Sequence, residues 1–238
     1  MIHIDPKEPG PDWDEWKKEA NSETKNLIDA AKAGESLKFK DRIWKEFKPF
    51  LEKLFHKKCA YCEGIYEGGA WMDAEHYRPK AKVTVDGVEI DHPGYYWLAY
   101  HWENLLLSCN KCNRASGKMN RFPIAGVRAA NPNDPLEKEN PLLLNPYDNE
   151  KPQDHLVFGI NGIVAGKTEK GRKTVEVCNL NREELQTSRQ REWEKMKVNL
   201  FLALLREDVK NAVTDDMAFS AYLRTTFAKF LGKAQSRV

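Results

Sequence analysis

The sequence carries two Cys-x-x-Cys pairs, Cys59/Cys62 and Cys109/Cys112, separated by 46 residues. Four thiolates suit a closed tetrahedral site of the kind that holds structural Zn²⁺. The separation is too long for a small zinc finger, so a folded insert must bring the two pairs together. Because such a site keeps no open coordination position, the zinc is expected to stabilise the fold and not to catalyse a reaction.

The insert carries residues suited to metal-assisted chemistry. The dipeptide Glu75-His76 stands on an expected strand, and asparagines follow at 104 and 113. A neutral imidazole at His76 can take a proton from water, while Glu75 and Asn113 offer hard oxygens that suit Mg²⁺. Asp73, two residues before Glu75, could share or replace its role. Asn104 opens a short apolar strand and is expected to brace the loop after His76 through backbone hydrogen bonds, not to bind metal.

The overall charge is nearly neutral, but basic residues concentrate in one region. The formal net charge is +2, with 31% charged and 41% hydrophobic residues, which indicates a folded chain that is not basic in bulk. Residues 104–130 contain five basic and no acidic residues. A phosphate-binding face is therefore expected there. The candidate phosphate contacts are Arg78, Lys80, Arg114 and Lys118.

The chain lacks the patterns of secreted or membrane proteins. Its first residues show no signal-peptide layout, and no segment approaches the roughly 18 to 20 apolar residues of a membrane span. A cytoplasmic location without membrane association is expected, and a reducing compartment favours metal over disulfide at the paired cysteines. The fifth cysteine, Cys178, follows a strand-like pattern and is expected to be a small buried residue.

The expected fold class is α+β, with helical segments on both sides of a small metal-held core. Residues 1–56 form an N-terminal helical segment, in which Asp12 caps a first helix and Pro49 interrupts a second amphipathic pattern. Residues 57–123 form the zinc-stapled core. It includes a hairpin around Asp86-Gly87, inserted between the strand of His76 and that of Asn104, and an aromatic cluster at 95–102 that is expected to pack inside.

Residues 124–238 are expected to contribute a surface loop, short strands and C-terminal helices. Strands are predicted at 156–160, 163–164 and 173–178. A helix is predicted to start near Asn181, with Leu185, Trp193, Met196, Leu200 and Leu204 on one face. A last helix is expected over 215–231 and ending at Gly232.

The Glu75-His76 pair, Asn104 and Asn113, framed by the cysteine pairs, resemble the HNH (ββα-metal) endonuclease family. The resemblance implies a ββα-metal core in which His76 is the general base and Asn104 is structural. It also implies that Glu75 and Asn113 bind Mg²⁺ or Mn²⁺. Many relatives carry Asp where this chain has Glu75, and the longer side chain shifts the metal position; Asp73 is the alternative ligand.

Several longer sequence segments are similar to the HNH effectors of Septu-type anti-phage systems, called the PtuB group. Members of this group also occur beside some retrons. The similar segments lie at residues 75–80, 92–100, 103–109, 142–146, 155–158 and 179–182. The resemblance implies an antiviral nuclease and a PtuA-like ATPase partner that restrains or licenses it. It makes DNA the default substrate and tRNA a serious alternative.

Two other functions fit part of the sequence. A zinc-stapled nucleic-acid-binding module without catalysis would explain the cysteines and the basic residues, but gives no reason for Glu75-His76 and Asn113. An assembly subunit could instead dock an ATPase, or a second copy of itself, through the helical ends, with a vestigial catalytic centre. Loss of cleavage in His76→Ala would separate the nuclease from both alternatives.

Overall fold

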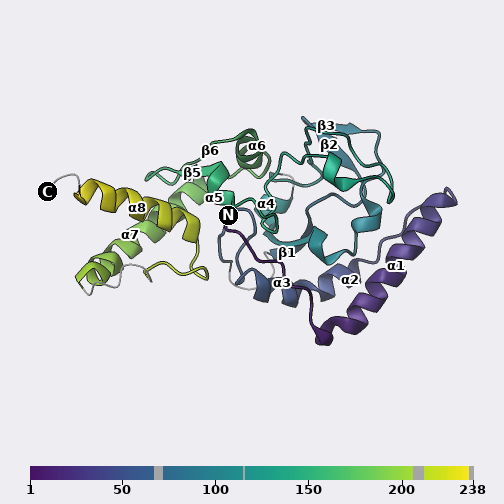
Figure 1. Cartoon of the computed structure of the whole chain (residues 1–238), viewed down its shortest axis with the longest axis horizontal. Coiled ribbons are helices and arrows are strands. Elements are labelled where there is room, and N and C mark those ends of the chain that lie inside the picture. The colour runs from purple at the N-terminus through teal and green to yellow at the C-terminus, as the bar shows by residue number, and fades with distance from the viewer. Residues whose placement is uncertain (67–71, 115, 206–211, 236–238) are drawn as a thin grey trace.

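The computed structural model describes residues 1–66, 72–114, 116–205 and 212–235, with the side chains of 198–205 and 233–235 excepted. The architecture is α+β, as the sequence predicts: helices surround small two-stranded antiparallel sheets (Figure 1). Helix α1 and the packed pair α7 and α8 lie at opposite ends of the molecule. The helices are α1 (Asp14–Lys32), α2 (Asp41–Glu46), α3 (Lys48–Leu54), α4 (Asn110–Asn113), α5 (Pro152–His155), α6 (Glu169–Val177), α7 (Glu183–Leu205) and α8 (Ser220–Gln235).

The central sheet pairs β1 (Met72–His76) with β4 (Leu105–Cys109). Its antiparallel register sets Met72 opposite Cys109 and His76 opposite Leu105, so the Glu75-His76 dipeptide and Cys109 share one small sheet. Every residue of β4 is buried, which explains its continuous apolar run. Helix α4 follows β4 without a break, so Cys109 is the last residue of the strand and Cys112 lies in the helix.

The predicted hairpin is confirmed between β1 and β4. Strands β2 (Val83–Val85) and β3 (Val88–Ile90) pair in antiparallel register. The turn residues Asp86 and Gly87 have φ of 47° and 82°. This is the left-handed conformation that two-residue hairpin turns require, and Asp-Gly adopts it at low cost.

The N-terminal helices depart from the sequence prediction at their starts. The cap predicted at Asp12 is wrong: Asp12 lies in a 3-10 turn, Pro11–Trp13, and Trp13 precedes α1 without a side-chain cap. The predicted interruption is confirmed, since α2 and α3 are separate helices that meet at Phe47. Pro49 sits in the first turn of α3, where its missing N–H costs no helical hydrogen bond.

The predicted strand at 173–178 is wrong, because these residues belong to α6 and the residue after it. Thr168 caps this helix by accepting a hydrogen bond from the backbone N–H of Gly171, a local signal that outweighs the alternating valines. The strands predicted around residue 161 are confirmed with shifted ends, as β5 (Leu156–Phe158) and β6 (Val164–Gly166). Cys178 is buried, as predicted, and burial raises the pKa of its thiol to about 12.

The C-terminal helices differ from prediction at their ends. Asn181 does not cap α7; its side chain instead exchanges two hydrogen bonds of 2.8 Å with the backbone of Val164. Helix α8 starts at Ser220, five residues later than predicted, and continues past Gly232. The predicted inner face of α7 is buried at Leu185, Trp193 and Met196, whereas Leu200 and Leu204 lie outside the described side chains.

Buried charges connect α8 to the first cysteine pair. Lys58 and Glu63 flank Cys59 and Cys62, and both side chains are buried. Glu63 accepts hydrogen bonds from the hydroxyl of Ser220 at 2.8 Å and the N–H of Ala221 at 3.2 Å. Lys58 donates to the Ser220 hydroxyl at 3.0 Å. The start of α8 is therefore anchored at the turn that carries Cys59 and Cys62.

The aromatic cluster at 95–102 is part of the core, as predicted. Tyr95, Tyr96, Trp97 and Tyr100 are buried, and they pack with neighbouring rings at centroid distances of 5.1–5.6 Å.

Within the described residues, no helix combines the length and the apolar character that crossing a membrane would need.

Candidate functional site

The four cysteines come together in a cluster that can hold one metal ion. Their sulfur atoms lie within 4.8 Å of one another and all four residues are buried. Cys59 and Cys62 come from the turn after α3, Cys109 from the end of β4 and Cys112 from α4. With Zn–S bonds of 2.3 Å, the sulfurs of a tetrahedral site stand about 3.8 Å apart. The measured Cys62–Cys109 sulfur separation is 3.9 Å, so the donors fit zinc in type and spacing.

An arginine from far along the chain faces this cluster. Arg182 directs one guanidinium nitrogen to the sulfur of Cys112 at 3.4 Å and the other to the sulfur of Cys109 at 3.8 Å. A fixed cation beside two sulfurs offsets negative charge, which supports a cluster of thiolates. The sequence marks Arg182 only as part of the segment 179–182 that is similar to the PtuB group, and it predicts no role for this residue.

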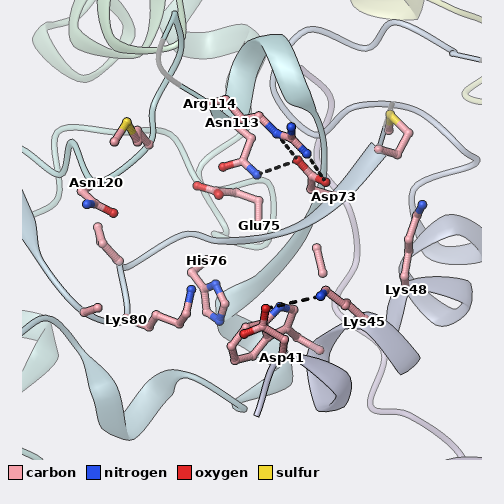
Figure 2. Close-up of a pocket in the computed structure, with 16 residues that line it drawn as sticks. Asp41, Lys45, Lys48, Asp73, Glu75, His76, Lys80, Asn113, Arg114 and Asn120 are labelled. Carbon is pink, nitrogen blue, oxygen red and sulfur yellow. Dashed lines mark hydrogen bonds and ion pairs between the residues drawn. The ribbon is translucent and has the colours of Figure 1, made fainter. Parts of the chain in front are cut away.

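A pocket of about 720 Å³ lies beside the cysteine cluster. It is bordered by β1, by α4 with the turn that follows, and by α2 and α3 from the N-terminal segment. Figure 2 shows acidic, amide and basic side chains reaching it from these separate elements. It brings together four residues that the sequence singled out for metal-assisted chemistry: Asp73, Glu75, His76 and Asn113.

His76 is held in one orientation by the core. Its Nε2 lies 2.9 Å from the carbonyl oxygen of Ala99. A carbonyl only accepts, so Nε2 carries the proton and Nδ1 keeps the lone pair of the neutral imidazole. The ring of Trp44 packs edge-on against it at 5.0 Å. Burial, assisted by the positive charge of Lys80, lowers the pKa of His76 to about 3, so the imidazole is neutral at physiological pH.

Glu75 is buried next to a buried cation. Its Oε1 accepts a hydrogen bond from Lys118 Nζ at 2.7 Å, and the Lys118 side chain is 0% exposed. Burial raises the pKa of the Glu75 carboxyl, and the charge of Lys118 opposes that shift. The sequence named Lys118 as a candidate phosphate contact. In the structure its ammonium is enclosed and directed at Glu75, with no exposed surface to offer a phosphate.

Asp73 and Asn113 lie close to Glu75 in Figure 2. The amide nitrogen of Asn113 donates to Asp73 Oδ2 at 3.1 Å, and Arg114 contacts both Asp73 oxygens at 3.2 and 3.3 Å. The amide oxygen of Asn113 is thereby the acceptor left for a cation. Asn113 is the last residue of the short helix α4.

Asn104 fastens the segment after His76. Its amide oxygen accepts from the N–H of Arg78 at 2.8 Å, and its amide nitrogen donates to the carbonyls of Arg78 at 3.0 Å and Leu98 at 3.2 Å. This geometry agrees with the bracing role expected from the sequence. The Arg78 side chain pairs with buried Glu139 at 2.8 Å. Lys80 lines the pocket, with its ammonium 4.6 Å from the Trp44 ring centre.

Several pocket residues were not found by sequence reasoning. Helices α2 and α3 contribute Asp41, Trp44, Lys45 and Lys48, and the turn after α4 contributes Asn120. The only local signal is the polar face of an amphipathic pattern, which every surface helix shows. Their place at the pocket depends on how the N-terminal helices pack against β1.

Comparisons with known proteins find similarity to the Septu system, and no protein-family model matches the chain. The chain is 43% identical over 147 residues to the Septu protein PtuB of Bacillus mycoides (strain KBAB4), which covers 60% of this chain and 49% of that protein. A PtuB of Bacillus thuringiensis is 28% identical over 69% of this chain and 53% of its own length. The Septu protein PtuA of Bacillus mycoides (strain KBAB4) is 38% identical over 56% of this chain and 19% of its own length. The chain thus spans about half the length of the PtuB relatives.

Proposed function

We propose that this chain carries an HNH-type endonuclease centre that hydrolyses phosphodiester bonds of nucleic acid with Mg²⁺ or Mn²⁺, as part of a Septu-type anti-phage defence complex. The observation that carries the proposal is the convergence of His76, Glu75, Asp73 and Asn113 on one pocket next to a four-cysteine cluster. Similarity to PtuB supports the defence context. In this proposal residues 57–123 are the nuclease core and 1–56 are an N-terminal helical segment. Residues 124–238 contribute a loop, short strands and C-terminal helices that pack on the core or on a partner.

His76 is assigned as the general base. Its Nε2–H is held by Ala99, so Nδ1 is the nitrogen that takes a proton from the attacking water. Burial keeps the ring neutral, so the lone pair of Nδ1 is free. Asn104 holds the backbone after His76 and so preserves the direction of the ring.

The oxygen donors in the pocket fit a hard divalent cation. Asp73, Glu75 and Asn113 offer carboxylate and amide oxygens, the donors that Mg²⁺ and Mn²⁺ prefer. When bound there, such a cation stabilises negative charge on the phosphate and on the leaving oxygen. Arg114 and Lys80 border the same pocket and are assigned to contact phosphates of the substrate.

Contacts of this kind are made to the phosphate backbone and not to the bases, so DNA and RNA are both chemically possible substrates. DNA is the proposed default substrate and tRNA the alternative. The proposed partner is a PtuA-like ATPase. The helical segments 1–56 and 180–238 are the proposed docking surfaces, for that ATPase or for a second copy of the chain.

The test is a cleavage assay of purified protein with and without the PtuA-like partner. Plasmid DNA, single-stranded DNA and bulk tRNA are each incubated with Mg²⁺ or with EDTA. The proposal expects metal-dependent cleavage that His76→Ala abolishes without loss of zinc or folding. His101→Ala is the matched control, because His101 is half exposed and lies away from the pocket.

The outcome decides between the proposed nuclease and the alternatives. Cleavage that survives in His76→Ala would overturn the assignment of the base. Absence of cleavage with every substrate and with the partner present would favour a zinc-stapled nucleic-acid-binding or assembly subunit. In that case gel-shift and co-purification experiments with the same samples identify which of the two it is.

A further inference from the structure

Glu75, which lines the pocket, is paired with a lysine whose ammonium is enclosed by protein. Lys118 donates to Glu75 Oε1 at 2.7 Å, to the carbonyl oxygen of His76 at 2.8 Å and, at a longer 3.4 Å, to that of Met119. An ammonium has three donors, so these acceptors account for all of them. Leaving the site would deprive the buried Glu75 carboxylate of its hydrogen-bonded counter-charge, which is strongly unfavourable.

The backbone around Lys118 is fixed as firmly as its side chain. Its N–H donates to the carbonyl of Cys112 at 2.7 Å, and the N–H of Met119 donates to that of Asn113 at 2.6 Å. Gly117 brings the chain so close to α4 that a Cβ would stand 2.1 Å from the Cys112 oxygen. The position of Lys118 is therefore set by α4 and the cysteine cluster.

The two carboxylates of the pocket differ in how their charge is balanced. Asp73 is paired with Arg114, whose side chain is 66% exposed and can turn into solvent. Glu75 is paired with Lys118, which is 0% exposed. An entering cation can displace Arg114 from Asp73 at low cost. At Glu75 it is repelled by Lys118, whose buried ammonium cannot turn into solvent. Repulsion between the two cations is weakly screened in this buried setting.

We propose that Lys118 is a positioning residue that occupies the side of Glu75 that would face a cation. Its positive charge lowers the affinity of the chain for divalent cations when no nucleic acid is bound. The inference rests on the proposed cation site of the nuclease. Asp73 and Asn113 then make the first protein contacts with the cation, and Glu75 orients His76 and the strand through Lys118. Lys118 neutralises Glu75 from within the fold and does not contact phosphate.

The test is direct binding of Mn²⁺ to the zinc-loaded chain, without nucleic acid, by titration calorimetry and by electron paramagnetic resonance. Lys118→Gln keeps a donor for the His76 carbonyl but removes the charge, and Lys118→Met removes both. Each should bind Mn²⁺ about tenfold or more tightly than the wild type, a coupling of ordinary size between two ligands. Added Mn²⁺ should also raise their melting temperatures, because the metal replaces the missing counter-charge of Glu75.

The control is Glu75→Gln combined with Lys118→Met, which removes both charges of the pair and should show no gain in Mn²⁺ affinity. Equal affinity in wild type and both single variants, or an equal gain in the double variant, would overturn the proposal. A Lys118 single variant that folds only when Mn²⁺ is added supports the proposal. A single variant that stays unfolded with Mn²⁺, while the double variant folds, contradicts the proposal. None of these readouts uses cleavage, so failure here is distinct from survival of cleavage in His76→Ala.

Discussion

At the scale of single residues, charge near the cysteine cluster is balanced by one distant side chain. A zinc ion bound by four thiolates carries a net negative charge, and Arg182 directs donors at two of the sulfurs. Hydrogen bonds of this kind from outside the ligand set hold metal ligands in place. Arg182 therefore belongs to the cysteine cluster although 70 residues separate it from Cys112.

Arg182→Gln should release zinc more readily, because it removes the charge that faces the thiolates. We expect about a 10- to 100-fold loss of zinc affinity, measured by competition with a chromogenic chelator. Lys111→Gln is the control, since Lys111 forms an exposed ion pair with Glu184 nearby at 2.6 Å. Equal zinc affinity in Arg182→Gln and wild type would show that the contact is incidental.

The burial of His76 predicts an unusual pH dependence. An ordinary histidine loses basicity as the pH falls through about 6.5, but burial lowers the pKa of His76 to about 3. Single-turnover cleavage should therefore not decline with a midpoint near 6.5 when the pH is lowered from about 8 to 5. A midpoint near 6.5 in the wild-type profile would contradict this and show that the ring is solvated when it reacts.

The same shift affects stability with a definite sign. Between pH 6.5 and about 3 the unfolded chain binds a proton at this residue and the native chain does not. The contribution of His76 to the free energy of unfolding is thus complete above pH 6.5 and declines as the pH falls toward 3.

At the scale of elements, the turn after α4 determines where the pocket residues stand. Gly117 lies against the carbonyls of Lys111 and Cys112 at distances that leave no room for a side chain. Asn113 and Arg114 precede this turn and Lys118 follows it, so the turn places the end of α4 against β1. No periodic pattern marks these residues, so the turn could not be predicted from the sequence.

Gly117→Ala should destabilise the protein by about 1 to 3 kcal/mol, the usual cost of overpacking, because the added Cβ would meet backbone atoms. Gly232→Ala is the matched substitution with the opposite sign. Gly232 lies within α8 and has nothing within 4 Å of a built Cβ, so alanine should stabilise by about 0.5 to 1 kcal/mol. Urea denaturation of both variants measures the difference, and equal midpoints would contradict the packing argument.

At the scale of the whole molecule, the sequence predicted what depends on local patterns. The paired cysteines, the Asp86-Gly87 hairpin and the strand of Glu75 and His76 could be located from spacing and turn chemistry. The contacts of Lys118 and Arg182, and the approach of α2 and α3 to the pocket, could not. These depend on how segments far apart in sequence pack, for which a single sequence carries no local signal.

Loss of zinc should affect regions far from the cysteines. Cys59→Ser should lose about one zinc per chain and lower stability, because binding of a structural metal contributes to folding. Proteolysis near α8 should increase as well, since Lys58 and Glu63 hold its first residues. Atomic absorption and limited proteolysis measure these effects, and full zinc occupancy in a folded Cys59→Ser variant would disprove the site.

A metal ion held by the four cysteines would also act as a cross-link that closes a long loop. The two cysteine pairs join the ends of a 46-residue segment, and the β2–β3 turn lies in its interior. The entropic cost of such a loop rises only by about 0.6 kcal/mol for each doubling of its length. Residues can therefore be added at Asp86-Gly87 without separating β1 from β4. The turn is a natural position for a fluorescent label or an affinity tag, and a place where related chains can vary in length around an unchanged pocket.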